Sequence, residues 1–303
     1  MEELALVAYT TLMQLAVGSF ITIELIRFFS TRKASALEAN RLTNRVVYAL
    51  GPIAAVGMLS SFLHLKVPLL SLNVLAKFGG SWMNLEIWFS LIFTGLVIAY
   101  SIIIKLSKVN LQLLKSIFAI VTSLVGLALV YCMARAYMID TYPAWNTLAT
   151  PVTFYVTTFL LGTVFIGAAI VANYHCAKKK DPDCGETSFL LLGNAVKWIT
   201  LAAIVALGVE MITIPLHLSY LAFAEIPAAA LSTGFWGGLL LALRLALVFV
   251  GAGILGIFVY RNAVQPNQKL RMSNLIYVVF ALVFVAEVVG RFLFYATGAS
   301  IVI

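Results

Sequence analysis

Charged side chains are scarce in this chain of 303 residues: Asp, Glu, Lys and Arg make up 11% of it, whereas hydrophobic residues make up 62%. A typical soluble domain has about 25% charged residues. Such a composition leaves too few polar side chains to cover a surface that faces water, so it excludes a soluble globular protein. It predicts one integral membrane domain over residues 1–303, with no soluble domain.

Cysteine and histidine are also scarce, with three of each. Cys132, Cys176 and Cys184 form no CxxC or CxxCH motif, so they offer neither a cluster site nor a haem attachment site. A haem pair that carries electrons across a membrane needs pairs of histidines at matched depths, and His64 and His217 could hold at most one haem. Ligand spacings typical of zinc and Gly-rich phosphate loops are missing too. We therefore expect no haem and no metal in this chain.

Long apolar runs are what the chain has in abundance, and runs of about 20 apolar residues predict membrane-spanning helices. The sequence predicts an all-α, polytopic bundle of eight transmembrane helices joined by short polar links. The expected helices cover residues of about 4–29, 46–63, 83–104, 111–137, 151–174, 189–214, 235–260 and 274–296.

Lysine and arginine are distributed unevenly between the two sets of links. The net charge of +8 would suggest nucleic acid as a partner of a soluble chain, but here it is better explained by loop charges that set orientation. The links after the first, third, fifth and seventh helices hold Arg32, Lys33, Arg41, Arg45, Lys105, Lys108, Lys178, Lys179, Lys180, Arg261, Lys269 and Arg271. The other links hold only Lys66 and Lys77. The positive-inside rule predicts that the first set is cytoplasmic and that both termini lie outside.

Charges within the predicted helices gather in the outer half of the membrane. They are Glu86, Arg135, Glu210, Arg244, Glu287 and Arg291, with His64 and His217 at the same level. Glu287 and Arg291 are four residues apart and so share a helix face. Glu287 with Arg291, and Glu210 with Arg244, could equally be structural ion pairs. In the inner half we expect Glu24, Lys115 and Lys197 to extend to the cytoplasmic surface.

The stretch from Ser61 to Glu86 joins two apolar runs and places His64 at the end of one and Glu86 at the start of the next. Ionisable groups at this depth are costly and indicate a functional site, although each could simply mark a helix end. Histidine and carboxylate are the usual acceptors of the protons that a quinol loses on oxidation. We therefore interpret the pair as a quinol site, with Arg135 as a neighbour that tunes it.

Several motifs give the chain a family resemblance. They are LHLKVPLLSLN at 63–73, NLE at 84–86, MARAYMIDTYPAW at 133–145 with TP at 150–151, LRL around Arg244, and AEVVGRFLFY at 286–295. With these motifs the chain resembles, nearly end to end, the membrane anchor subunits of dimethyl sulfoxide reductases, which belong to the wider NrfD-like group of quinol-interacting subunits.

The resemblance implies a haem-free subunit of the bacterial inner membrane that binds menaquinol on the periplasmic side. It also implies that electrons pass to an iron–sulfur subunit, which feeds a molybdopterin catalytic subunit, so that this chain does not act on the terminal substrate. The family's histidine after its second helix matches His64, and its menaquinol-linked glutamate matches Glu86. The implied quinol site comprises His64, Asn73, Glu86, Arg135 and Tyr137. Leu70 stands where the family has an arginine, and Glu24 has no counterpart in the family pattern.

Two other interpretations are compatible with the same charges. A proton- or ion-coupled transporter would use buried charges, but it would normally place them near the midplane within inverted repeats. A purely structural anchor would have no quinol site at all. If quinol is oxidised here without haem, the acceptor must lie close, and we expect the outer loops at 66–82 and 140–150, with exposed Trp82, Tyr142 and Trp145, to contact the iron–sulfur subunit.

Overall fold

The computed structural model describes residues 2–30, 36–62, 78–106, 112–180, 186–223, 235–264 and 269–297, and every regular element in these ranges is helical. The elements are α1 (Glu2–Ser30), α2 (Ala36–Phe62), α4 (Trp82–Leu106), α5 (Gln112–Tyr137), α6 (Ala149–Lys180), α7 (Glu186–Phe223), α9 (Phe235–Val248), η2 (Phe249–Leu255), α10 (Gly256–Val264) and α11 (Lys269–Ala296). The predicted all-α class is confirmed.

The helices begin and end close to the predicted positions, but several are longer. α2 begins at Ala36, ten residues before the expected start, and α7 continues to Phe223 through Pro215. For α2, the prediction marked only the apolar turns, whereas polar turns rich in Ala, Leu, Glu and Arg also favour a helix. For α7, the prediction ended the helix just before Pro215, which the structure accommodates within it. Within the described residues, seven helical segments are long and apolar enough to cross a membrane, and α2 is not among them. The predicted count of eight is therefore not confirmed.

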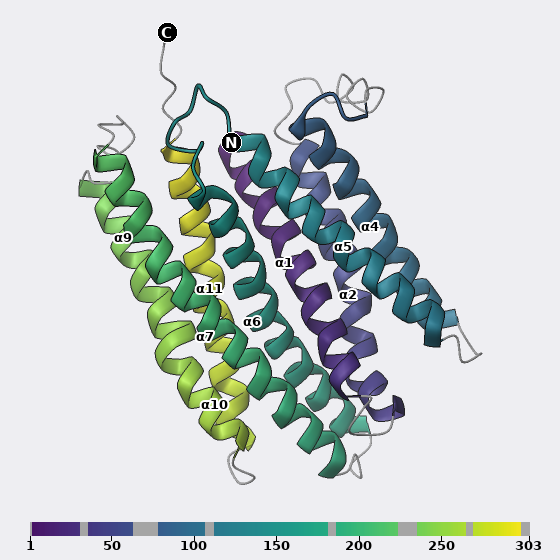
Figure 1. Ribbon diagram of the computed structural model, residues 1–303. Coiled ribbons are helices and arrows are strands. Elements are labelled where there is room, and N and C mark those ends of the chain that lie inside the picture. Colours follow the sequence, from purple (N-terminus) through teal and green to yellow (C-terminus); the bar gives the residue numbers. More distant parts are fainter. Residues whose placement is uncertain are drawn as a thin grey trace.

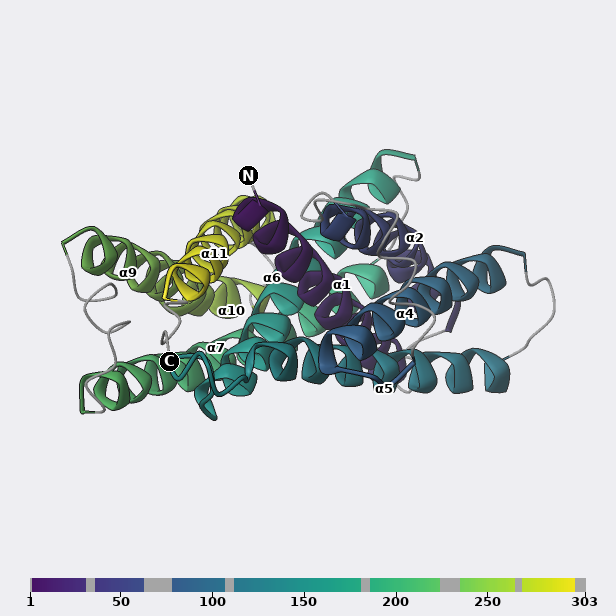
Figure 2. The same cartoon turned by 90° about the horizontal axis from the view of Figure 1, so that it is seen from above.

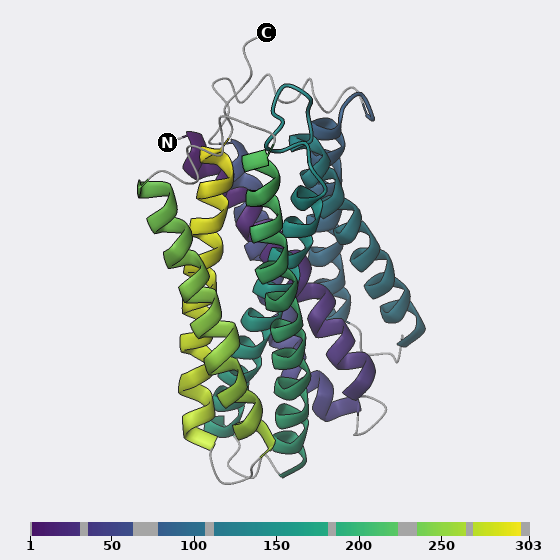
Figure 3. The ribbon, with the colours of Figure 1, turned by 60° about the vertical axis from the view of Figure 1, so that its left-hand side comes forward.

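Two central helices, α1 and α6, pack against each other along the middle of the bundle (Figures 1 and 2). The helices α2, α4 and α5 lie on one side of this pair, and α7, α9, α10 and α11 lie on the other. The first turn of α1, the last turn of α11 and the 138–148 connection share one end of the bundle, here called the upper end as in Figure 1 (see also Figure 3). The C-terminal turn of α6, with its lysines, lies at the opposite, lower end.

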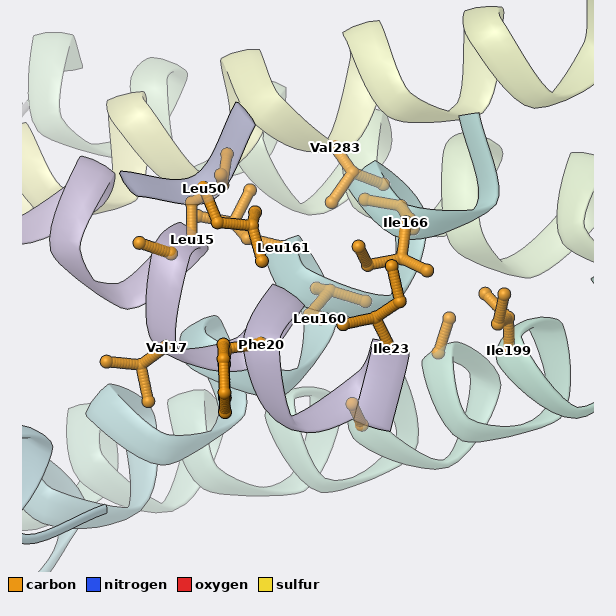
Figure 4. Close-up of a cluster of buried hydrophobic side chains, with 14 of the residues drawn as sticks. Leu15, Val17, Phe20, Ile23, Leu50, Leu160, Leu161, Ile166, Ile199 and Val283 are labelled. Carbon is orange, nitrogen blue, oxygen red and sulfur yellow. The ribbon is translucent and has the colours of Figure 1, made fainter. Parts of the chain in front are cut away.

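The core lies where the central pair meets its neighbours (Figure 4). Phe20 and Ile23 of α1, with Leu160 and Ile166 of α6, are fully buried. α2, α7 and α11 add Leu50, Ile199 and Val283. Tight packing of this kind holds membrane helices in one register, because lipid supplies no hydrophobic driving force between them. The positions of polar groups on α1 and α6 are fixed as a result.

The predicted helix at 235–260 contains an irregularity that was not predicted from the sequence. Residues Phe249–Leu255 form a π-helical segment, η2, between α9 and α10. A Cβ atom on Gly251 within it would lie 3.2 Å from side-chain atoms of both Leu282 and Val283. The widened turn therefore lies tightly against α11 at a glycine. Such π segments are frequent near functional sites, and Arg244 lies only five residues before this one.

Candidate functional site: polar clusters at the upper end of the bundle

Three of the five predicted site residues fall within the described part of the chain, namely Glu86, Arg135 and Tyr137. His64 and Asn73 lie outside the described residues, so the expected contact between His64 and Glu86 stays a prediction. The three described residues lie at the upper ends of α4 and α5. They therefore share one end of the bundle, as the sequence predicted.

Glu86 lies in the second turn of α4 and is buried, with 6% of its surface exposed. Tyr9 of α1 is its hydrogen-bonding neighbour. The Tyr9 hydroxyl group also lies 2.8 Å from Oγ of Ser90, which is one turn after Glu86. The carboxyl group is therefore enclosed by α1 and α4 and is held by a group that can donate a hydrogen bond.

Tyr137, at the last turn of α5, belongs to a second set of hydroxyl groups beside Glu86. Its hydroxyl oxygen lies 2.8 Å from that of Tyr295 on α11, and the Tyr295 hydroxyl donates to Oγ1 of Thr10 at 3.4 Å. Glu86 interacts electrostatically with both tyrosines. Glu86, Tyr9, Tyr137 and Tyr295, with Ser90 and Thr10, are called the Glu86 cluster below. It contains a carboxyl group and several hydroxyl groups that can exchange protons.

An aromatic layer covers the Glu86 cluster from the upper end. The Tyr137 ring packs against Trp145, Phe154 and Phe294, and the Trp145 indole N–H donates to the Phe294 carbonyl oxygen at 2.9 Å. The ring of Tyr142 stacks on Trp145 at 4.7 Å between centroids. Trp145 and Tyr142 were expected to be exposed, but both are half-buried. Tyr142 packs on Trp145, and Trp145 packs on Phe294 of α11, so the 138–148 connection lies against this helix.

Arg135, the predicted neighbour of Glu86, packs against the exposed start of α4. Its guanidinium group lies over the ring of Trp82, 5.1 Å from the centroid, at the upper end of α4. A cation in this position is attracted by the face of the indole ring. Trp82 itself is exposed, as expected, with 39% of its surface accessible. In the described structure Arg135 therefore supports the exposed aromatic surface.

A second group of buried charges, here called the Arg244 cluster, joins α7, α9 and α11. Nη2 of Arg244 lies 2.5 Å from Oε1 of Glu210 and 3.6 Å from Oε2 of Glu287. Thr157 of α6 donates to the same Glu287 oxygen at 2.6 Å. The predicted pair of Glu210 and Arg244 is confirmed.

The alternative of an ion pair between Glu287 and Arg291 is wrong, although both residues point into the bundle. Arg291 instead donates to Oε1 of Gln14 on α1 at 2.6 Å, and its guanidinium group lies 3.9 Å from the centroid of the Phe154 ring. Gln14 in turn donates to the Phe154 carbonyl oxygen at 3.0 Å. On α11, Glu287 faces Arg244 of α9. Arg291 faces α1, where Gln14 accepts its hydrogen bond.

A cavity of about 100 Å³ lies beside the Arg244 cluster, between α6, α7, α9 and α11. Its polar lining includes His217, Arg244, Glu287 and Arg291, together with threonines of α6. His217, which the sequence placed at the same depth as His64, lies 3.4 Å from Oγ1 of Thr147. Charged groups and a space large enough for water thus meet near the upper end.

At the lower end, Glu24 does not extend freely to the surface as expected. It pairs with Arg27 at 2.9 Å and accepts a hydrogen bond from the Tyr100 hydroxyl at 2.8 Å. Arg27 also donates to Thr43 at 2.8 Å and to Asn44. This group joins α1, α2 and α4, and a satisfied, half-buried ion pair of this kind needs no further role.

Sequence reasoning missed Tyr9, Gln14 and Tyr295 as parts of the upper polar network. A usable signal existed for Gln14, because an amide inside an otherwise apolar helix is expensive unless it is hydrogen-bonded. The sequence also contained a signal for Tyr295, since Glu287, Arg291 and Tyr295 follow one another at intervals of four residues and therefore share one face of α11. Tyr9 gave no comparable signal, since aromatic residues are common near membrane interfaces.

Comparison with known proteins places the chain in a family. The family model described as DMSO reductase anchor subunit (DmsC) matches residues 1–297. The C subunit of the anaerobic dimethyl sulfoxide reductase of Escherichia coli is 28% identical over 305 aligned residues, which cover 99% of this chain and 96% of that protein. The corresponding subunit of Haemophilus influenzae is 31% identical over 56% of this chain and 60% of its own length. This multi-pass membrane protein therefore belongs to the family of DMSO reductase anchor subunits.

Proposed function

We propose that this chain is the haem-free membrane anchor of a dimethyl sulfoxide reductase-like complex and that it oxidises menaquinol beside Glu86. Membership of the anchor family supports the role in a complex. The observation that supports the site is the position of Glu86, which is buried at the upper end and surrounded by hydroxyl groups of three other helices. A carboxyl group in this setting suits a substrate that must lose protons as it loses electrons.

The proposed reaction converts menaquinol to menaquinone and releases two electrons and two protons. Glu86 accepts the proton of one hydroxyl group of the substrate, His64 binds the second hydroxyl group and accepts its proton, and both protons then pass to water at the upper end. Tyr9 holds the Glu86 carboxyl group in position through its hydroxyl group. The electrons leave to an iron–sulfur subunit and then reach a molybdopterin subunit, which acts on the terminal acceptor.

We place the upper end on the periplasmic side of the bacterial inner membrane. This orientation follows from the distribution of lysine and arginine, since the lysine-rich end of α6 lies at the lower end. The partner subunits then contact the upper end. Because the protons leave on the side where the quinol is oxidised, the step moves no net charge across the membrane.

The test compares quinol-driven turnover with dye-driven turnover in the assembled complex. Glu86→Gln keeps the shape of the side chain but removes the base, and loss of a general base costs about 10²–10⁴-fold in rate. We expect such a loss with a menaquinol analogue, while a reduced dye still drives the catalytic subunit normally. His64→Ala should behave in the same way, with weaker quinol binding in addition.

Glu24→Gln is the matched control, because Glu24 is a carboxylate at the lower end of the bundle, away from the proposed quinol site and partner surface, and pairs with Arg27. It should leave both activities unchanged. Normal quinol turnover in Glu86→Gln and His64→Ala would remove these residues from the mechanism.

A further inference from the structure

The Arg244 cluster contains two glutamates for one arginine, and all three are deeply buried. The side chains of Glu210 and Glu287 each expose 1% of their surface, and that of Arg244 exposes 11%. Arg244 is held in place by Gly290, because a Cβ atom on that glycine would lie 2.2 Å from Nε of Arg244. The arginine is thus fixed against α11 and reaches both carboxyl groups with one nitrogen.

The two carboxyl groups converge on the same atom, Nη2 of Arg244, from which their nearest oxygens lie 2.5 Å and 3.6 Å away. Each leaves one buried oxygen, Oε2 of Glu210 and Oε1 of Glu287, without a hydrogen-bond donor among the described residues. Two ionised carboxylates can only accept hydrogen bonds, whereas a protonated one donates. A single proton between the two groups would satisfy both oxygens and would leave one negative charge for Arg244.

The neighbouring charges do not supply an alternative donor to these oxygens. Arg291, one turn from Glu287 on α11, donates a hydrogen bond to Gln14 and lies over the ring of Phe154. Thr157 donates to the other oxygen of Glu287. His217 of α7 lines the adjacent cavity, where its ring contacts Thr147.

The adjacent cavity provides a path for a proton. A cavity needs about 10–15 Å³ to hold one water molecule, so a volume of about 100 Å³ has room for several. Its lining includes Ala149, the first residue of α6, and Thr297, which follows α11, so it reaches the upper end of the bundle. Sites for drug-sized ligands typically measure about 300–1,000 Å³, so water suits this space better than a quinone ring does.

We propose that Glu210 and Glu287 form a carboxyl pair that binds one proton and exchanges it with water at the upper end of the bundle through this cavity. This proton-binding site is distinct from Glu86 and does not depend on the proposed quinol reaction. Its ligand is a single proton, and Arg244 positions the two carboxyl groups that share it.

Infrared difference spectroscopy of the purified full-length chain at neutral pH tests the proposal. The spectrum should contain the carbonyl stretch of a protonated carboxylic acid, and the band should shift when the protein is transferred to D₂O. Glu210→Gln and Glu287→Gln should each abolish the same band, because either change leaves one carboxylate for Arg244. Asp140→Asn, and separately Glu86→Gln, should leave that band in place.

The outcome is decisive even if one variant does not fold. A wild-type spectrum without any protonated carboxyl band would overturn the proposal, and so would a band that survives in either folded Glu→Gln variant. Thr153→Leu places a larger side chain in the cavity lining while keeping both glutamates. It should retain the band but slow its shift in D₂O, and an unchanged rate would overturn the route through the cavity.

Discussion

Gly18 of α1 lies directly against Gly162 of α6, so that the two helix backbones touch where they cross. A Cβ atom on Gly18 would lie 1.8 Å from the Thr158 carbonyl oxygen, and one on Gly162 would lie 2.2 Å from the carbonyl carbon of Gly18. Small residues at a crossing allow this close approach of membrane helices. The crossing sets the register between α1, which carries Tyr9 and Gln14, and α6, whose Thr157 donates to Glu287 of the Arg244 cluster.

Gly162→Ala should therefore destabilise the whole bundle. The new methyl group meets backbone atoms, which cannot rotate away as a side chain can, so the helices must separate. Overpacking in a well-packed core typically costs about 1–3 kcal/mol, occasionally more, and we expect the upper end of this range. Thermal unfolding in detergent measures the effect. Gly95→Ala on α4 is the matched control, because a Cβ atom there meets nothing within 4 Å, and a loss of stability equal to that of Gly162→Ala would contradict the argument.

The sequence predicted the parts of the fold that depend on local composition. Long apolar runs located the helices, and charges inside those runs, such as Glu86 and Glu210, located the upper half as the polar one. The hydroxyl groups around Glu86 could not be predicted, because Tyr9 meets Ser90 across 81 positions and Tyr137 meets Tyr295 across 158. Such contacts depend on how the helices cross and rotate, and a single sequence does not encode this in any local pattern.

Tyr9→Phe should weaken quinol oxidation without preventing assembly. The change removes the hydroxyl group that contacts Glu86 and Ser90 and keeps the ring. A hydrogen bond to a charged group contributes about 1.5–3 kcal/mol, so we expect a fall of roughly 10- to 100-fold in menaquinol-driven kcat, with dye-driven turnover unchanged.

Tyr155→Phe is the control for this experiment, because the Tyr155 hydroxyl donates to the backbone carbonyl of Leu127 at 2.9 Å and not to a member of the Glu86 cluster. Its quinol-driven kcat should stay close to that of the wild type. Equal losses in the two variants would show that tyrosine hydroxyl groups matter here only for packing.

The orientation of the bundle is open to a direct test with reporter fusions. Basic residues near helix ends are retained in the cytoplasm, so a reporter placed within Lys178–Lys180 should read as cytoplasmic, and one placed after residue 297 should read as periplasmic. The described structure already puts the C-terminal turns of α6 and α11 at opposite ends. A periplasmic signal from Lys178–Lys180 would reverse the proposed orientation and would move the Glu86 cluster to the cytoplasmic side.

The surface at the upper end of α4 should contact the proposed iron–sulfur subunit. Phe78, Trp82 and Met83 expose 67%, 39% and 58% of their surfaces there, and aromatic residues and methionine are enriched at protein interfaces. A photo-crosslinking residue in place of Met83 should capture the iron–sulfur subunit in the assembled complex. Leu106, 70% exposed at the lower end of the same helix, provides the matched position and should capture only lipid. Capture of the partner from position 106 but not from 83 would place the electron acceptor at the end opposite Glu86, which is incompatible with quinol oxidation beside that residue in a chain without haem.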